Sequence, residues 1–97
     1  MSILVDENTT FIIQGITGRE AVTMARGVLD YGSKLLGGVT PGRKGRDVHG
    51  VPVEDTVRAF TERERVDASV VSVPPAFAVD AVNEAIEAGI KLIVIVT

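Results

Sequence analysis

Short apolar runs alternate with segments of helical periodicity along the whole chain, and this alternation constrains the fold more than any other feature. The apolar runs are typical of buried strands and lie at residues 11–14, 35–39, 69–73 and 91–96. Apolar side chains recur at helical spacing, most weakly in the middle segment, over residues 19–31, 54–64 and 76–88. Strands that alternate with helices need right-handed crossovers, which produce a parallel sheet. We therefore expect an α/β fold, a Rossmann-like doubly wound parallel sheet in three αβα layers.

Glycine and a scarcity of aromatic residues support the same architecture. Gly37 and Gly38 weaken the second strand but allow another backbone to approach it closely. Residues 40–50 follow neither period and are predicted to be a loop, with a brief extended piece at residues 51–53. The chain has only three Phe, one Tyr and no Trp. A core rich in Val, Ile and Ala suits parallel strands that are covered by helices on both faces.

Composition excludes several classes of function. A chain of 97 residues has room for one domain, spanning residues 1–97, and its net charge of −3 argues against a nucleic-acid partner. The absence of cysteine excludes disulfides, thiolate metal ligands and a cysteine nucleophile. No apolar run is long enough to cross a bilayer and the start lacks the pattern of a signal peptide. We expect a soluble, cytoplasmic domain with no membrane partner.

Neither catalysis nor metal binding is predicted within this chain. No paired carboxylates and no metal-ligand spacing stand out, and His49, the single histidine, is interpreted as a surface residue in the irregular loop. The chain ends at Thr97, directly after the last predicted strand. Because a complete doubly wound protein rarely ends there, we expect the domain to be a fragment of a longer polypeptide.

The first strand-to-helix turn is a candidate phosphate-binding site. Ligands of open parallel sheets bind beyond the carboxyl ends of the strands, and Gly15 and Gly18 lie at the first of these ends. Glycine lets the backbone pass close to a bound group, free amides at a helix start attract phosphate, and Thr17 adds a hydroxyl. The spacing departs from the dinucleotide fingerprint, because Thr17 and Glu20 hold two of its glycine positions. The alternative is a tight turn without a ligand.

The loop after the second strand is basic. Arg43, Lys44 and Arg46 lie on it, and no carboxylate occurs before Asp47. Enzymes that use NAD place an acidic side chain at this point, whereas cations favour a phosphate on the ribose. The ligand is therefore expected to be NADP or coenzyme A, unless the loop is merely a solvated basic surface. At the third strand end, Pro74 belongs to a rigid apolar turn that is suited to line an adenine or a thiol arm, and the equal alternative is a simple helix start.

Five segments carry a family resemblance that runs along residues 1–97 without a gap. They read Ser-Ile-Leu-Val-Asp at 2–6, Gln-Gly-Ile-Thr-Gly-Arg-Glu at 14–20, Gly-Val-Thr-Pro-Gly at 38–42, Gly-Val-Pro-Val at 50–53 and Glu-Ala-Ile-Glu-Ala-Gly-Ile at 84–90. Together they resemble the amino-terminal domain of the alpha subunit of succinyl-CoA synthetase (succinate–CoA ligase). The resemblance implies that coenzyme A is the cofactor and that it is contacted by Thr17, Gly18, Arg19, Glu20, Arg43, Val96 and Thr97.

The resemblance also implies an activity for the whole enzyme. Such ligases interconvert succinyl-CoA and succinate with phosphorylation of ADP or GDP, and the alpha subunit pairs with a nucleotide-binding beta subunit in a heterodimer or heterotetramer. The phosphohistidine belongs to the rest of the alpha subunit, outside this chain, so the 97 residues alone are expected to be inactive.

Two departures from the family pattern keep other functions open. Arg43 and Lys44 follow Thr-Pro-Gly where the family has lysine and then glycine, so either cation is a candidate to meet the phosphate. Ala21 stands where glycine is usual, although its small side chain still permits close helix–strand packing. The alternatives are a Rossmann domain that binds NADP or another nucleotide for redox or sensing, and a stand-alone coenzyme A-binding module.

Overall fold

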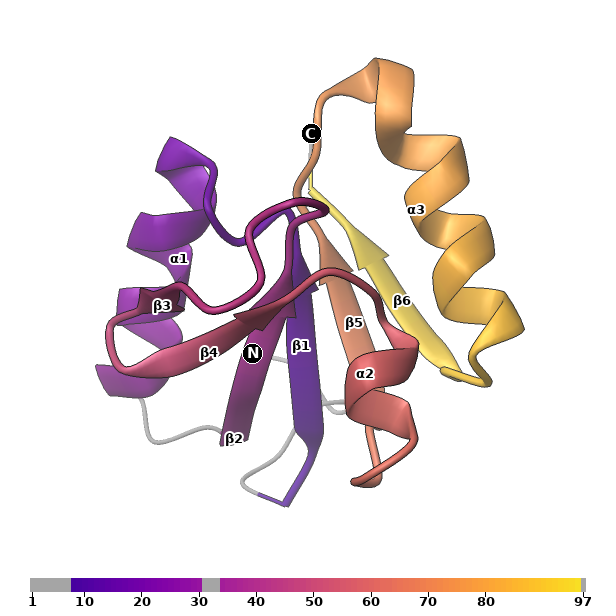
Figure 1. Cartoon of the computed structure of the whole chain (residues 1–97), viewed down its shortest axis with the longest axis horizontal. Coiled ribbons are helices and arrows are strands. Elements are labelled where there is room, and N and C mark those ends of the chain that lie inside the picture. Colours follow the sequence, from indigo (N-terminus) through magenta and orange to yellow (C-terminus); the bar gives the residue numbers. More distant parts are fainter. Residues whose placement is uncertain (1–7, 31–33, 97) are drawn as a thin grey trace.

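A six-stranded sheet forms the centre of the computed structural model, which describes residues 8–30 and 34–96. The strands lie in the order β3-β4-β2-β1-β5-β6. Their bounds are β1 (Thr10–Gln14), β2 (Lys34–Val39), β3 (Asp47–Val48), β4 (Val51–Glu54), β5 (Ala68–Val71) and β6 (Leu92–Ile95). The helices are α1 (Arg19–Asp30), α2 (Arg58–Thr61) and α3 (Pro75–Glu87). In Figure 1, α1 lies on one side of the sheet and α2 and α3 lie on the other, which confirms the three layers.

All strand pairs except one are parallel, as expected for a doubly wound fold. From β1 the chain moves outward in one direction through β2 and β4, and it then returns to build β5 and β6 on the other side of β1. The order of strands therefore reverses between β1 and β5. In open sheets this reversal is the point at which ligands bind.

The structure corrects two sequence predictions in the middle of the chain. Residues 40–50 are not all loop, because β3 pairs antiparallel with β4 through a two-residue turn. His49 and Gly50 form that turn with φ values of 51° and 88°, as a tight hairpin requires. The helix predicted over residues 54–64 is also wrong in extent, because β4 continues to Glu54 and α2 spans only Arg58–Thr61.

Both faces of the sheet are buried at its centre. Along β1, Phe11 and Ile13 pack on the side of α1, while Ile12 packs on the side of α2 and α3. Gly38 of β2 has no room for a side chain, since a Cβ atom there would overlap Ile16. Ile16 fills the space that this glycine leaves. The close approach of another backbone is confirmed at the neighbouring Gly37, where a Cβ atom would overlap the carbonyl oxygen of Pro52.

Helix α3 buries a narrower face than its sequence predicts. Ala85 is fully buried, but Val79 and Ile86, which share the expected apolar face, are 70% and 57% exposed. The reason is that α3 packs on the sheet mainly over β5 and β6, which leaves the flank with Val79 and Ile86 exposed. No helix among the described residues is long and apolar enough to cross a membrane.

A buried amide links this helix to the sheet. Gln14 ends β1, its Nε2 donates to the carbonyl oxygen of Ala81 in α3 at 2.8 Å, and its Oε1 accepts from the Ser69 hydroxyl at 2.7 Å. Every buried side-chain nitrogen and oxygen among the described residues has a hydrogen-bond partner. Gln14 therefore holds α3 against the sheet without the cost of an unpaired polar group.

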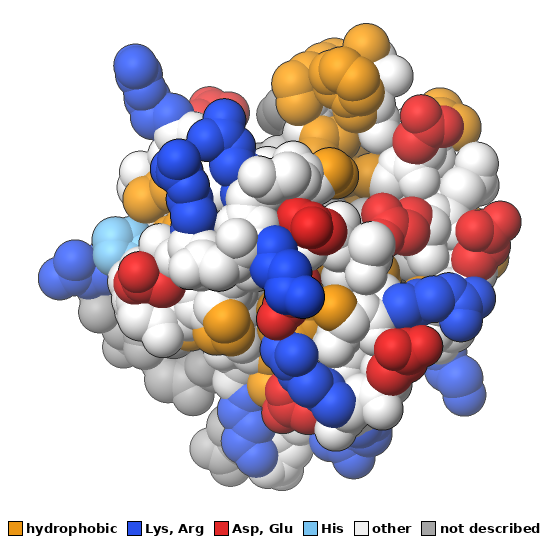
Figure 2. Space-filling view, viewed as in Figure 1, with side chains coloured by type: hydrophobic (Ala, Val, Ile, Leu, Met, Phe, Trp, Pro, Cys, Tyr) orange, Lys and Arg blue, Asp and Glu red, His pale blue; other side chains and the backbone are white. Residues whose placement is uncertain are grey.

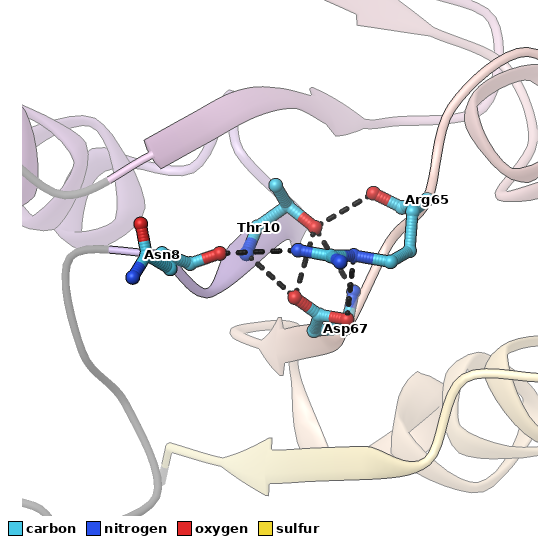
Figure 3. Close-up of polar contacts among 4 residues, drawn as sticks. All are labelled: Asn8, Thr10, Arg65 and Asp67. Atoms are coloured by element: carbon cyan, nitrogen blue, oxygen red, sulfur yellow. Dashed lines mark hydrogen bonds and ion pairs between the residues drawn. The ribbon is translucent and has the colours of Figure 1, made fainter.

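A second polar network closes the opposite, amino-terminal edge of the sheet (Figure 3). The Asp67 carboxylate accepts from the Thr10 backbone N–H at 3.0 Å and pairs with the Arg65 guanidinium at 3.1 Å. The Thr10 hydroxyl donates to the Arg65 carbonyl oxygen at 2.6 Å. The N–H of Thr10, followed by the charge of Arg65, holds the pKa of Asp67 below its ordinary value of 3.8, against an opposing effect of burial.

Asp67→Asn is expected to lower the free energy of unfolding at neutral pH and to change its dependence on acid. Because the folded-state pKa of Asp67 is lowered, its stabilisation is present in full above the ordinary value of 3.8 and is lost as the pH falls through the folded value. The difference in stability between the wild type and the variant should therefore shrink in acid. Urea denaturation between pH 7 and pH 2 measures this difference, with Asp80→Asn as the exposed control. A difference that does not vary with pH would contradict the assignment.

Candidate functional site

A crevice of about 510 Å³ opens beyond the carboxyl ends of the strands at the point where their order reverses. Gln14 and Gly15 form its floor at the end of β1. The end of β2 contributes one side, and α3 contributes the facing wall with Phe77, Asp80 and Glu84. The crevice is mainly apolar at its sides, with two carboxylates on the wall of α3.

A second cavity, of about 480 Å³, lies on the α1 side of the loop between β5 and α3. The first residues of α1 line it on one side, and Ala78, Ile95 and Val96 line it on the other. Gly18 and Pro74 border both cavities. The two spaces thus adjoin along a single boundary made of the first turn and the β5–α3 loop.

The first turn is held close to that loop by a glycine with an unusual backbone angle. Gly15 has φ +89°, and its N–H donates to the Val39 carbonyl oxygen of β2 at 2.7 Å. A Cβ atom at Gly15 would overlap the carbonyl oxygen of Ser72. Both the angle and the contact exclude a side chain, so this glycine is required by the fold itself.

Unpaired backbone amides mark the start of α1. The N–H of Val22 is the first that donates one turn back, to the Gly18 carbonyl oxygen at 2.9 Å. The amides of Arg19, Glu20 and Ala21 donate to no acceptor among the described residues. A helix start with free N–H groups carries partial positive charge and accepts an anion such as a phosphate. All three residues also line the second cavity.

The hydroxyl of Thr17 joins the first turn to the loop after β2. It donates to the hydroxyl oxygen of Thr40 at 3.1 Å, and the backbone N–H of Thr17 lies 3.4 Å from the same atom. Both threonines line the crevice. The two loops that the sequence singled out therefore meet at this pair.

The other predicted site residues divide between the two cavities. Gly15, Thr17, Gly18 and Pro74 surround the crevice, while Arg19, Glu20 and Val96 line the second cavity. Thr97 lies outside the described residues.

The basic residues stand apart from both cavities. Arg43 and Lys44 are exposed on the loop after β2 and line neither space. Figure 2 shows basic side chains at the upper left of this face and hydrophobic side chains over the amino-terminal end of α3 across from them. His49 is exposed and its Nε2 lies 3.0 Å from the Val22 carbonyl oxygen, in keeping with a surface residue.

Sequence reasoning missed the wall that α3 contributes. Phe77, Asp80 and Glu84 follow one another at helical spacing, and Phe77 is 61% exposed. The signal that could have found them was an aromatic residue outside the predicted apolar face of the helix. Glu84 also accepts the backbone N–H of Val57 at 2.7 Å, which ties the start of α2 to this wall. Among the described residues no group of His, Asp or Glu side chains could hold a metal ion.

The fold and these cavities define a class: a Rossmann-like domain with cavities at the switch point of its sheet, where open sheets bind phosphate-bearing cofactors. Comparison with known families specifies it further. Residues 6–97 match the family described as the CoA binding domain, and the chain belongs to that family. The cofactor is coenzyme A, one of the two cofactors that the residues of the first turn and the basic loop left open.

The relatives confirm the resemblance to succinate–CoA ligases. The chain is 50% identical over its whole length to a succinate–CoA ligase (ADP-forming) alpha subunit of Archaeoglobus fulgidus, of which it covers 33%. It is 45% identical, again over its whole length, to the malate–CoA ligase alpha subunit of Methylorubrum extorquens, of which it also covers 33%. The chain thus spans about a third of the length of these relatives.

Solved structures confirm the Rossmann-like fold. A conserved hypothetical protein from Pyrococcus furiosus superposes with a TM-score of 0.76 at 23% identity, over 91% of this chain and 74% of that one. The Rex-family repressor RSP in complex with beta-NADH superposes with a TM-score of 0.78 at 26% identity, over 96% of this chain and 48% of that one.

Gly15→Ala is expected to destabilise the fold far more than Gly18→Ala. At Gly15 the angle is unfavourable for alanine and the methyl group would overlap Ser72, so we expect a loss of about 2–3 kcal/mol. At Gly18 a Cβ atom would meet only the Gly15 carbonyl oxygen, at 3.3 Å, so the loss should stay below about 1 kcal/mol. Urea denaturation of the two variants checks this order. Equal losses would show that the first turn adapts to a side chain at Gly15.

Proposed function

We propose that the chain is the coenzyme A-binding domain of an acid–CoA ligase alpha subunit. The ligase would interconvert succinyl-CoA and succinate with phosphorylation of ADP or GDP. One observation carries the proposal: two cavities adjoin at Gly18 and Pro74, beside the free amides at the start of α1. Two adjoining cavities with free amides at their boundary suit a long ligand that has phosphates in its middle, a nucleotide at one end and a thiol arm at the other.

In this proposal each part of coenzyme A has its own surface. The adenosine occupies the crevice, between the Pro74 turn with Phe77 and the end of β2. The pyrophosphate meets the amides of Arg19 and Glu20, where the helix start favours negative charge. The thiol arm extends along the second cavity toward Val96, with Thr97 following. Arg43 or Lys44 then meets the phosphate on the ribose.

The remaining parts of the enzyme are proposed from the relatives. The chain spans about a third of their length, so the rest of the alpha subunit would supply the phosphohistidine. A beta subunit would complete the ligase as a heterodimer or heterotetramer and bind the nucleoside diphosphate. A cytoplasmic location and a place in the tricarboxylic acid cycle belong to the same proposal. Malate is the second candidate acid, because a malate–CoA ligase is among the relatives.

Dinucleotide binding is the competing function, since the chain resembles a repressor solved with beta-NADH at 26% identity. Two features of the site oppose it. No carboxylate follows β2 before Asp47 to hold ribose hydroxyls, and the cations Arg43 and Lys44 stand there instead. A stand-alone coenzyme A-binding module would use the same site and differs only in what the rest of the polypeptide does.

Coenzyme A is expected to bind more tightly than 3′-dephospho-coenzyme A and than NADP. The cation that meets the ribose phosphate makes a charge-assisted contact worth about 1.5–3 kcal/mol, or roughly tenfold to hundredfold in Kd. Calorimetric titration of the wild type, Arg43→Ala and Lys44→Ala with all three ligands measures this. The preference for coenzyme A over its dephospho form should shrink most in the variant that lacks the contacting cation. It should also shrink with added salt.

Two results would contradict the proposal. If NADP binds most tightly, the site is a dinucleotide site. If coenzyme A and its dephospho form bind equally to the wild type, the basic loop does not read the phosphate. Arg26→Ala, on the exposed side of α1, serves as a control for the general loss of one positive charge.

Without further protein, the 97-residue chain is expected to form no succinyl-CoA from ATP, succinate and coenzyme A. His49, its single histidine, is bound to the Val22 carbonyl oxygen and lines neither cavity. Thiol-ester formation followed by chromatography checks this. Turnover above that of a heat-denatured sample would place the phosphoryl carrier inside this chain.

A further inference from the structure

The loop that carries the basic residues has no backbone amide left for an anion. Five consecutive N–H groups, those of residues 42–46, all donate within the protein. Three of them donate to backbone carbonyl oxygens, at distances of 3.0–3.2 Å. The other two, of Gly42 and Lys44, donate to one carboxylate oxygen of Asp55 at 2.9 and 3.1 Å.

This arrangement differs from that at the start of α1. There the amides of Arg19, Glu20 and Ala21 are free to bind an anion, whereas at the basic loop only side chains remain available. Recognition of a phosphate by this loop therefore depends on where the backbone directs the side chains of Arg43 and Lys44. Whatever holds the loop backbone determines that direction.

The end of β4 and the residue that follows it, Asp55, provide that hold. Thr40 donates its backbone N–H to the carbonyl oxygen of Glu54 at 3.0 Å, and Gly45 donates to that of Val53 at 3.2 Å. The amides of Gly42 and Lys44 lie between Thr40 and Gly45 in the loop. Both donate to the Oδ1 atom of Asp55, which is half-buried. Asp55 is the one side chain among the described residues that accepts hydrogen bonds from the backbone of residues 41–46.

We propose that Asp55 is a positioning residue for recognition of the ribose phosphate, because its carboxylate sets the course of the loop that presents Arg43 and Lys44. The proposal rests on the proposed binding of coenzyme A. The negative charge of Asp55 would by itself weaken the binding of a phosphate nearby. Its geometric effect and its charge effect therefore have opposite signs, and this makes them separable.

Asp55→Asn and Asp55→Ala separate the two effects. Asparagine keeps an oxygen with two lone pairs, so it can accept both amides while the charge is removed. Alanine removes both the charge and the acceptor. Asp47→Ala is the matched control, because it removes an exposed carboxylate close to Arg46 that accepts only the Gly50 amide, at 3.2 Å.

The measured quantity is the ratio of the Kd for 3′-dephospho-coenzyme A to the Kd for coenzyme A. We expect Asp55→Ala to lower this ratio about fivefold to tenfold, the effect of losing two ordered amide contacts. Asp55→Asn and Asp47→Ala should leave the ratio at or above that of the wild type. The Kd for the dephospho form should stay constant in all variants, because the crevice and the second cavity are untouched.

Other results overturn the proposal. If Asp55→Ala and Asp55→Asn raise the ratio to the same extent, Asp55 acts through its charge alone. A parallel loss of affinity for both ligands in Asp55→Ala would show a general structural role. A ratio in Asp55→Ala that is no lower than the ratio in Asp55→Asn would show that the loop does not depend on the Asp55 acceptor.

Amide hydrogen exchange without ligand keeps this test apart from that of the proposed function. In Asp55→Ala the Gly42 and Lys44 amides should exchange at least about tenfold faster than in the wild type, since they lose their acceptor. In Asp55→Asn they should remain protected. If these amides exchange alike in all three proteins, Asp55 does not hold the loop, whatever the ligand. If the exchange follows expectation but the wild type binds no coenzyme A, the proposed function is wrong, whereas the conclusion that Asp55 holds the loop remains valid.

Discussion

The backbone contact between Gly15 and the loop after β5 is the constraint on which the site depends. Because the strand order reverses between β1 and β5, the chain leaves these strands toward opposite faces, to α1 and to α3. Gly15 lacks the atoms that would push the two exits apart, and a Cβ atom there would overlap Ser72. As a result the crevice and the second cavity share one thin boundary instead of being separate pockets.

The two ends of the sheet use hydrogen bonds in opposite ways. At the amino-terminal edge, Thr10, Arg65 and Asp67 satisfy one another in a closed network (Figure 3). At the carboxyl-terminal edge, the first amides of α1 stay unpaired and two cavities remain open. Pairing stabilises the folded chain, whereas unpaired donors cost stability unless water or a ligand takes them. The amino-terminal edge of the sheet therefore contributes paired hydrogen bonds that stabilise the fold, whereas the carboxyl-terminal edge keeps donors available for binding.

Anions can be held at this carboxyl edge in two physically different ways. Backbone amides at the start of α1 are fixed by the helix and respond to any phosphate of suitable position. The basic loop offers flexible side chains, because Asp55 and nearby carbonyl oxygens have already taken its amides. A fixed donor set provides affinity that is common to many phosphate-bearing cofactors. Directed side chains can discriminate among them, since their contacts depend on a phosphate at one place.

The sequence by itself determined the order of the main strands and helices, the parallel sheet and the edge at which the crevice opens, because apolar periodicity and glycine turns are local signals. It also placed Gly15, Thr17, Gly18 and Pro74 at that edge, and the structure brings them together around the crevice.

Only the tertiary structure decided the short elements and the helix faces. Strand β3 has two residues and α2 has four, too few to show a period, and each is held by what it packs against. Val79 is exposed and Phe77 lines the crevice because α3 packs on the sheet mainly over β5 and β6, so the rest of its surface stays open. The anchoring of the basic loop by Asp55 was likewise beyond the sequence, because a hydrogen bond between distant residues depends on where the fold brings their atoms.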